Sequence, residues 1–456
     1  ALHRSIYYGY IENSQLLKRF GASFDIFDGD FLTPLQLIPN PCIYSAQSAA
    51  YVFGKNKNYN LGIGNVNSRQ YPEMVKSLPP IQMASINKFH SLFLSSGKLF
   101  GCGISKEGRI GIGSENTVVN AQEIAIKFNH KHEKISSVSA GLHHSLILTQ
   151  KSVYGCGSNK HFQLGLRDVE RALVFTEIHF DRMEVNVTKL NTVIACDYHS
   201  IFVNPQGVYI CGLNLGQFSG IQESIPFPRK LANPSQHSDL KIQWAESNNC
   251  CICVYATVKE TNFLTIYYNR RVKTFKNPMM EKLTKCCISG GEMLYNSDEI
   301  VKNSSQKPLT IVLMTEHKNF YIYYEDILQF VKVHVSPLFS SQIRDFMTCG
   351  DGILVEADGH LFQTTIQHKL SKMYQAESEY QEFHSKKEIA QFLCSKMSFK
   401  RIQSVSNVES FSCDVDGESF VTILSQRTIR VPAIKKEAFD FSTLLYDDFE
   451  YANSGI

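Results

Sequence analysis

The chain has 456 residues, of which 43% are hydrophobic and 20% charged, as in ordinary globular proteins. Its 46 basic and 43 acidic side chains leave a net charge of +3, which excludes the broad basic field that non-specific nucleic-acid binding requires. No apolar run reaches the roughly 18 residues of a membrane span, and we expect no signal peptide. The 13 cysteines lie mostly within apolar runs, which predicts thiols in a reducing compartment. We therefore expect a cytoplasmic location, with the nucleus left open.

A short repeat period lies at the N-terminus. Ala1-Leu2-His3 is followed about 33 residues later by Thr33-Pro34-Leu35, and Gly21 stands where a helix would end with a positive φ. An apolar face at helical spacing consists of Ile6, Ile11, Leu16 and Leu17. The segment resembles an ankyrin repeat, so we expect residues 1–43 to be the helical end of an ankyrin array that has lost its earlier repeats or packs on the next domain.

A longer period of 49 to 55 residues is marked by glycines, and each of these is followed eight residues later by another: Gly54 and Gly62, Gly103 and Gly111, Gly157 and Gly165, and Gly212 and Gly220. His-Ser pairs keep the same frame and precede apolar triplets; they are His90-Ser91, His144-Ser145 and His199-Ser200. Each triplet, with the apolar pair after the next polar turn, predicts two short strands joined by a hairpin.

The segments Val52-Phe53-Gly54-Lys55-Asn56 and Val153-Tyr154-Gly155-Cys156-Gly157 resemble RCC1 repeats. That resemblance implies a mainly β fold, a seven-bladed propeller over residues 44–435. After residue 245 the marks fade, and Cys250 stands where a histidine would be. We expect about three degenerate blades from the remaining strand-like runs, which are residues 263–268, 309–314, 320–324, 353–355, 361–362 and 420–424, with residues 428–431 closing the ring.

Residues 366–400 interrupt the strand rhythm with a charged, helical pattern. Ser385 and Glu388 form a capping box, and Ile389, Phe392, Leu393 and Met397 share one face at helical spacing. We expect an inserted helix that packs against a blade edge. Residues 436–456 predict a linker toward a following domain.

The order of modules, together with Ile288-Ser289-Gly290-Gly291-Glu292-Met293, is similar to the inhibitor of Bruton tyrosine kinase family. Members of that family carry BTB domains after the propeller, and these dock on cullin-3. The resemblance therefore implies the partner-binding part of a ubiquitin ligase adaptor, whose partners are client proteins and a Tec-family kinase. We predict a non-catalytic protein–protein interaction module that binds no nucleic acid.

A second hypothesis is a guanine-nucleotide exchange factor for a Ran-like small GTPase, because the founding RCC1 protein acts on such an enzyme with one propeller face. It rests on fold analogy alone. Chromatin binding is a third hypothesis, which the modest net charge disfavours.

No catalytic, cofactor-binding or metal-binding residue is predicted. The His-Ser pairs recur once per blade and cannot meet in one site, so we expect each imidazole to bond to the backbone. Gly101-Cys102-Gly103 opens no helix, and Cys250, Cys251 and Cys253 lack the partners of a zinc site. Partner binding is expected at the degenerate blades, where Tyr321-Ile322-Tyr323-Tyr324 is rich in aromatic residues, and at the inserted helix over residues 385–398.

Overall fold

The computed structural model describes residues 2, 11–23, 26, 47–180, 187–215, 222–231, 240–269, 271–276, 278–291, 309–335, 337–340, 342–350, 352–366, 385–402, 405, 407–414 and 416–426. The chain divides into two compact units, and residues 47–425 form the larger one. No helix among the described residues is long and apolar enough to cross a membrane.

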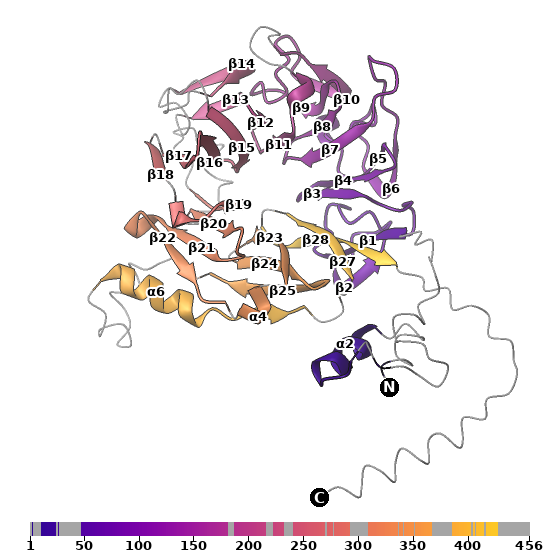
Figure 1. Ribbon diagram of the computed structural model, residues 1–456. Helices are drawn as coiled ribbons and strands as arrows, with labels where there is room; N and C mark the ends of the chain where they lie inside the picture. Colours follow the sequence, from indigo (N-terminus) through magenta and orange to yellow (C-terminus); the bar gives the residue numbers. More distant parts are fainter. Residues whose placement is uncertain are drawn as a thin grey trace, which may run out of the picture. The chain divides into compact units, whose positions relative to one another are not determined.

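The larger unit is a ring of seven four-stranded antiparallel sheets, here called blades 1 to 7 (Figure 1). In blade order from the inner strand outward, blade 1 contains β3 (Met83–Ile86), β4 (His90–Ser95), β5 (Lys98–Gly103) and β6 (Val118–Ile124). Blade 2 contains β7 (Ile135–Ala140), β8 (His144–Thr149), β9 (Val153–Ser158) and β10 (Arg171–Ile178). Blade 3 contains β11 (Thr192–Ala195), β12 (His199–Asn204), β13 (Gly207–Leu215) and β14 (Gln222–Lys230).

The later blades keep the same order of strands. Blade 4 contains β15 (Leu240–Ser247), β16 (Cys251–Val258), β17 (Thr261–Tyr268) and β18 (Arg271–Lys276). Blade 5 contains β19 (Leu283–Ser289), β20 (Thr310–Thr315), β21 (Phe320–Tyr324) and β22 (Gln329–Val333). Blade 6 contains β23 (Ile343–Cys349), β24 (Gly352–Ala357), β25 (His360–Thr365) and β26 (Lys400–Arg401).

Short helices join some of these strands: η1 (Lys106–Gly108), η2 (Val187–Lys189), η3 (Pro278–Met280), η4 (Glu325–Ile327), α4 (Pro337–Ser340) and α6 (Lys386–Lys396). The seven-bladed β-propeller predicted from the RCC1 resemblance is thus confirmed, including strands in the degenerate half.

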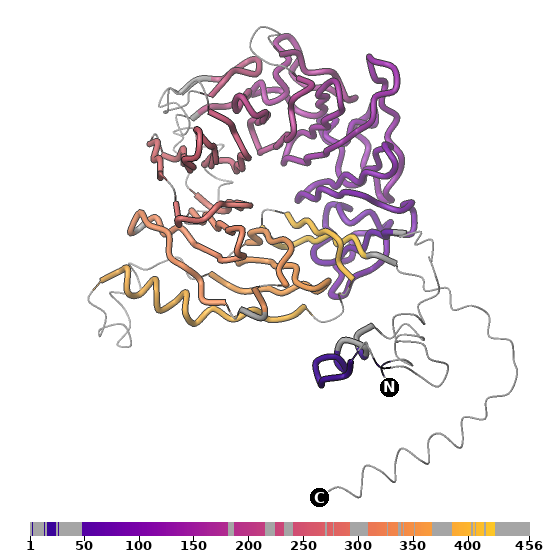
Figure 2. Tube along the Cα trace, viewed as in Figure 1, coloured from indigo at the N-terminus to yellow at the C-terminus, as the bar shows by residue number. Residues whose placement is uncertain are grey.

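Blade 7 closes the ring with strands from both ends of the propeller. Its inner strands are β27 (Val408–Cys413) and β28 (Ser419–Gln426), and its outer strands are β1 (Gln47–Gly54) and β2 (Arg69–Met74). Figure 2 shows the indigo start of the propeller beside its yellow end. The closing strand was expected at residues 428–431, but β28 takes this role, and those residues lie outside the described part. The proposed domain limits at 44 and 435 and the linker 436–456 also lie outside it.

Burial along the strands follows their position in each blade. The second strands β4, β8, β12, β20 and β24 are buried at every position, because neighbouring blades cover both of their faces. In the outer strand β6 only Val118, Ala121 and Ile124 are buried, at every third position. This explains why the apolar triplets after the His-Ser pairs are continuous rather than alternating.

Three of the joints between successive blades are each built on one main-chain carbonyl. Between blades 1 and 2, the carbonyl oxygen of Arg109 accepts a hydrogen bond from Ser145 Oγ at 2.6 Å and another from Cys156 Sγ at 3.5 Å. The same arrangement recurs with Ser91 and Cys102 on Asn60, and with Ser200 and Cys211 on Gln163. A Cβ atom added to Gly111 would lie 3.0 Å from Cys156 Sγ, so a glycine is needed where this loop reaches the next blade.

The histidines of the His-Ser pairs complete these joints. His90 Nε2 lies 2.7 Å from Ser145 Oγ of the next blade, and His144 Nε2 lies 2.8 Å from Ser200 Oγ. Because each serine donates its own hydrogen to a carbonyl, it must accept from the imidazole, which fixes the neutral Nε2–H form. For His90 and His144 the predicted bond from imidazole to backbone is therefore wrong, because the partner is a serine side chain one blade further on.

Serines also tie the inner strands of successive blades together. The amides of Ala140 and Ala195 donate to Ser85 Oγ and Ser139 Oγ of the preceding blade at 3.0 and 2.9 Å. At the closing blade, the Ile86 amide donates to Ser412 Oγ at 3.4 Å. Inner strands are sheet edges, so these hydroxyls satisfy amides that the sheet itself leaves without a partner.

In the smaller unit, the structure describes the backbone of helix α2 (Ile11–Arg19). Gly21 follows it with φ +90°, and its amide donates to the Lys18 carbonyl, so the predicted helix end is confirmed. Leu16, predicted to stack on a neighbouring repeat, is 51% exposed. One helix does not establish the ankyrin repeat, which stays a prediction.

The repeat glycine at the end of each third strand provides a stability test. A Cβ atom at Gly103 would lie 2.3 Å from the Phe89 carbonyl oxygen, and Gly103 has φ +114°. Gly97 also has a positive φ, +82°, but its nearest neighbour would be 4.0 Å away, at Lys134 Cγ. We expect Gly97→Ala to lower the free energy of unfolding by about 1 kcal/mol and Gly103→Ala by at least about 3 kcal/mol, since only the latter adds a clash. Urea unfolding of both variants measures this; equal losses would contradict it.

The buried histidines predict a loss of stability in acid. Burial lowers the pKa of His144 to about 3, so the folded protein excludes a proton that the unfolded chain binds below about pH 6.5. The stability that the neutral, buried His144 contributes is therefore fully present above about pH 6.5. It is lost progressively as the pH falls toward the pKa of about 3 in the folded protein. Relative to His144→Gln, the wild type should lose about 2 kcal/mol more between pH 7 and pH 5. Unfolding curves that shift in parallel for both proteins would show that this histidine does not couple folding to pH.

Candidate functional site

The structure places the three His-Ser pairs in three successive blades, where the histidine of one pair contacts the serine of the next, as His90 contacts Ser145, and the three pairs do not gather in one site. His144 and Ser145 are both fully buried, and the Ser145 proton is committed to the Arg109 carbonyl. A hydroxyl without solvent access, facing an imidazole that donates to it, has no base to activate it. These side chains hold blades together.

The twelve cysteines that the structure describes are all buried thiols. Cys251, not Cys250, occupies the histidine position of blade 4, because the Asn248 amide donates to the Cys251 carbonyl as the Asn87 amide does to that of His90. Burial raises the pKa of the Cys196 and Cys251 thiols, which makes them poor nucleophiles. Within the described ranges, no group of three or more His, Cys, Asp or Glu side chains is arranged to hold a metal ion.

The inserted helix α6 lies within blade 6 in the chain but packs on the outer strand of blade 5 (Figure 1). Ser385 is its N-cap, and its Oγ accepts a hydrogen bond from the Glu388 amide at 3.3 Å, as the capping box predicts. The buried face consists of Ile389, Ala390, Leu393 and Cys394, which pack on Val331 and Val333 of β22. The His334 amide also donates to the Cys394 carbonyl at 3.4 Å, which fixes the helix to the blade.

Phe392 was predicted to share the buried face, and the structure shows it 37% exposed. At about 100° per residue, Phe392 lies about 130° from the centre of the buried arc, so it points to the groove side of the helix. Met397, predicted on the same face, follows the helix as its C-cap and packs against the same core.

A groove runs between the exposed side of α6 and the edge of blade 5, with a volume of about 750 Å³. It is lined by Tyr321, Phe330, Val331, Lys332 and His334 from the blade, and by Lys387, Glu388, Gln391, Phe392 and Ser395 from the helix. Its walls therefore combine aromatic rings with cationic side chains and a single carboxylate. We call it the α6 groove.

Aromatic contacts join the α6 groove to blade 4. The rings of Phe330 and Phe275 meet edge to face at 5.3 Å between centroids, and Tyr323 lies 5.1 Å from Phe330. Lys273 Nζ lies 4.9 Å from the centroid of the Phe275 ring and donates to the Leu328 carbonyl at 2.7 Å. These contacts connect the aromatic side chains of the α6 groove to residues of blade 4.

The aromatic run at residues 321–324 was predicted as a possible partner surface. Tyr323 and Tyr324 are only 5% and 4% exposed, whereas Tyr321 reaches the groove. Phe330, Lys332 and His334 were not singled out. Their alternation with the buried Val331 and Val333 along β22 is the signal that could have found them.

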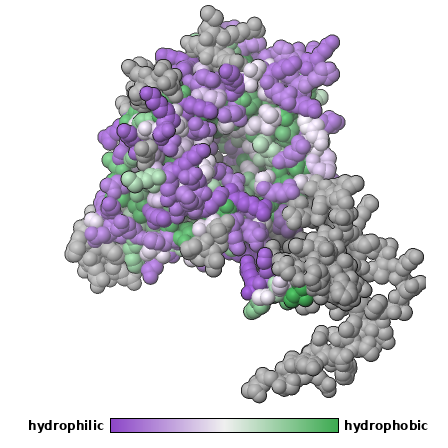
Figure 3. Space-filling view, viewed as in Figure 1, coloured by the Kyte–Doolittle hydropathy of each residue, from purple (hydrophilic) through white to green (hydrophobic). Residues whose placement is uncertain are grey.

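The visible face of the propeller is mostly hydrophilic, and its apolar side chains show in small groups (Figure 3). On that face there is no broad apolar surface among the described residues.

Comparison with known proteins supports the repeat assignment. Two models described as the regulator of chromosome condensation (RCC1) repeat match residues 48–94 and 135–163. Inhibitor of Bruton tyrosine kinase from Mus musculus is 28% identical over 330 residues, which cover 67% of this chain and 23% of that protein. The Xenopus laevis protein of the same name is 26% identical over 473 residues, covering 98% of this chain and 34% of the relative.

BTB/POZ domain-containing protein 1 from Schizosaccharomyces pombe is 30% identical over 270 residues, which cover 51% of this chain and 20% of that protein. The chain thus spans about a third or less of the length of these relatives.

Two solved structures share the propeller. Human WBSCR16 superimposes with a TM-score of 0.60 at 15% identity, covering 83% of this chain and 99% of that one. Prp20p from Saccharomyces cerevisiae gives 0.59 at 12% identity, covering 89% and 96%. At such identities the likeness shows the fold alone.

The N-cap of α6 provides a local test of the groove wall. Ser385→Ala removes the acceptor of the Glu388 amide and should cost about 1 kcal/mol of helix stability, whereas Ser385→Asp keeps an acceptor. Amide hydrogen exchange over residues 386–396 should therefore quicken in the alanine variant and stay near wild type in the aspartate variant. Equal protection in all three proteins would mean that packing alone holds the helix.

Proposed function

We propose that this chain is the partner-binding part of a non-catalytic adaptor protein. The observation that carries the proposal is the similarity to inhibitor of Bruton tyrosine kinase, which extends over 67% of this chain in the mouse protein and 98% in the frog protein. The propeller supports it physically, because buried seams leave a rigid ring whose outer wall and loops are available for contacts.

The α6 groove is the proposed partner site. It is lined by the half-exposed Phe392 and by Lys332 and Lys387, and none of these side chains takes part in the blade joints. Aromatic residues at the centre of a concave surface are typical anchors of protein interfaces. The proposed clients are proteins destined for a cullin-3 ligase, with a Tec-family kinase among them, and the related BTB/POZ protein makes a BTB-linked adaptor consistent with this role.

A reducing compartment, the cytoplasm or the nucleus, fits the proposed role. The twelve described cysteines are buried thiols, and several of them donate hydrogen bonds within the blade joints.

Nucleotide exchange on a Ran-like GTPase is the alternative. It draws on the fold shared with Prp20p, which was described with its binding to Gsp1p and histones. Release of labelled GDP from a Ran-like GTPase, measured with and without the protein, separates the two: acceleration would favour the exchange factor.

Immunoprecipitation of the full-length protein tests the adaptor, with client proteins and cullin-3 quantified separately. Phe392→Asp should reduce client recovery about tenfold, because it puts an unpaired charge among the groove rings, and should leave cullin-3 unchanged. Tyr71→Asp is the matched control, since this ring is 71% exposed on β2 of blade 7. Clients that persist with Phe392→Asp would contradict the groove as their site, and clients bound only through a BTB region would contradict the adaptor role of this chain.

A further inference from the structure

We infer that the α6 groove binds a short acidic segment of a partner protein that also carries aromatic or aliphatic side chains. The inference rests on the proposed function and specifies the partner's chemistry. It is carried by the charges on the outer wall, the exposed apolar side chains between them, and the length of the groove.

Positive charge is concentrated on β22 and α6, which line the groove, and on β18, which contacts β22 through Phe275 and Phe330. Among the described residues of β18, β22 and α6, the cationic side chains are Arg271, Lys273, Lys276, Lys332, Lys386, Lys387 and Lys396, and the single acidic one is Glu388. The whole chain has 46 basic and 43 acidic residues, so this excess is local. Glu325 of η4, just before β22, only partly offsets it. Such a wall attracts carboxylates and repels basic segments.

Apolar surface lies between these charges. Phe392 is 37% exposed and Leu328 is 46% exposed. Lys396 Nζ lies 5.5 Å from the centroid of the Phe392 ring, so this charge and this ring are presented side by side. A segment with only acidic residues would leave the rings in contact with water, and a purely apolar one would leave the lysines without partners. A mixed acidic and apolar segment satisfies both.

The groove sets the length of the segment. An eleven-residue helix such as α6 is about 16 Å long, which matches about five residues of extended chain. The volume of about 750 Å³ holds several side chains but no folded domain. A peptide motif therefore fits the site better than a globular surface does.

Nucleic acid fits the groove less well, although it too is an anion. A phosphate backbone needs a continuous basic track, and Glu388, Gln391 and Ser395 interrupt the lysines on the helix side. An oligonucleotide that competes for the site is therefore kept as an outcome of the test.

The test is fluorescence anisotropy of the full chain with labelled synthetic peptides. One pool alternates Asp and Glu with Phe, Tyr and Leu, a second replaces the acids with Lys and Arg, and a third replaces them with Ser. We expect the acidic pool to bind more tightly than the other two, with affinity that falls as salt is raised.

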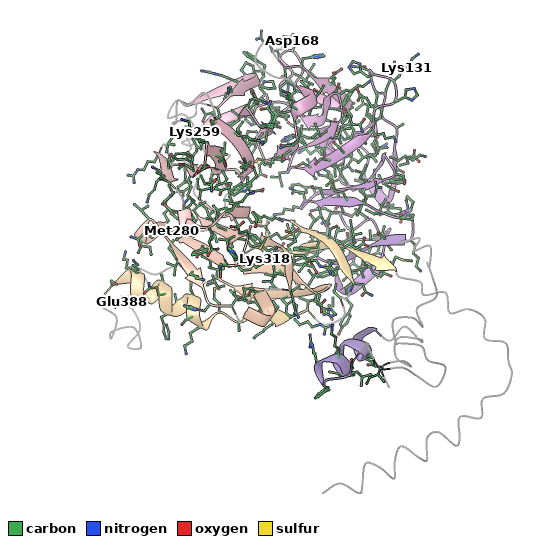
Figure 4. The ribbon with its side chains drawn as sticks, viewed as in Figure 1. Lys131, Asp168, Lys259, Met280, Lys318 and Glu388 are labelled. Carbon is green, nitrogen blue, oxygen red and sulfur yellow. The ribbon has the colours of Figure 1, made fainter. Side chains whose placement is uncertain are left out.

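Charge reversal identifies the wall. Lys332→Glu combined with Lys387→Glu should weaken the acidic pool about tenfold, because two exposed ion pairs become repulsive. Lys131→Glu is the matched control, since Figure 4 shows Lys131 on the opposite side of the ring from Glu388. Circular dichroism and thermal melting check that the variants fold as the wild type does.

Other outcomes overturn the inference. They are equal binding of the acidic and serine pools, an unchanged affinity in the double variant, and displacement of the peptide by a single-stranded oligonucleotide. If the serine pool binds as tightly and Phe392→Asp still abolishes it, the acidic preference fails while the proposed adaptor site survives. If no pool binds and Phe392→Asp leaves client recovery intact, the groove fails as a partner site altogether.

Discussion

The blade joints depend on main-chain carbonyls that would be buried without a partner if the next blade did not supply one. Burying such a group costs roughly 1–3 kcal/mol, and the hydroxyl of a serine on the next blade removes that cost. Its own acceptor site is then filled by a histidine from the blade before, as for Ser145 between Arg109 and His90. Glycine, serine, cysteine and histidine recur together in the sequence because residues of all four types meet at the same joint between two blades.

The later blades use different side chains at their joints. In blade 4, Ile252 follows Cys251 where a serine follows each histidine, so the hydroxyl is missing. That serine would belong to the joint with blade 3. At the joint with blade 5, the rings of Trp244 and Tyr255 stack at 5.2 Å, and the Tyr255 hydroxyl accepts from the Leu283 amide at 3.2 Å. These joints do not require the repeat motif. The same half of the ring carries α6 and the cationic wall.

Much of the propeller could be predicted from the sequence, because its strongest signals are local. Gly103 with φ +114° and the apolar run after His90 reflect the conformation and burial of their own strands. The partner of His90 was missed because it lies 55 residues away, in another blade. The available signal was the serine that follows each histidine. The sequence did not show its role, because the histidine of one pair bonds to the serine of the next pair, in the neighbouring blade.

The α6 groove could be predicted only in part. Ser385 and Glu388 marked the helix start correctly, since capping is a local interaction. Which blade the helix would cover was not encoded locally: α6 lies between strands of blade 6 and covers β22 of blade 5. Phe392 was assigned to the buried face because helical spacing predicts only which residues share a broad side of the helix. How much of that side is buried depends on the position of the neighbouring blade, which the local sequence does not encode.

Closing the ring through blade 7 has a consequence for synthesis on the ribosome. Thr422 Oγ1 bonds to the Tyr51 carbonyl across 371 residues, and Ser48 reaches Glu409 across 361. The first two strands of the propeller must therefore wait, with β1 lacking its inner neighbour, until almost the whole propeller has been translated. During that time β1 presents an unpaired strand edge, the kind of surface through which incomplete β-sheet proteins associate wrongly.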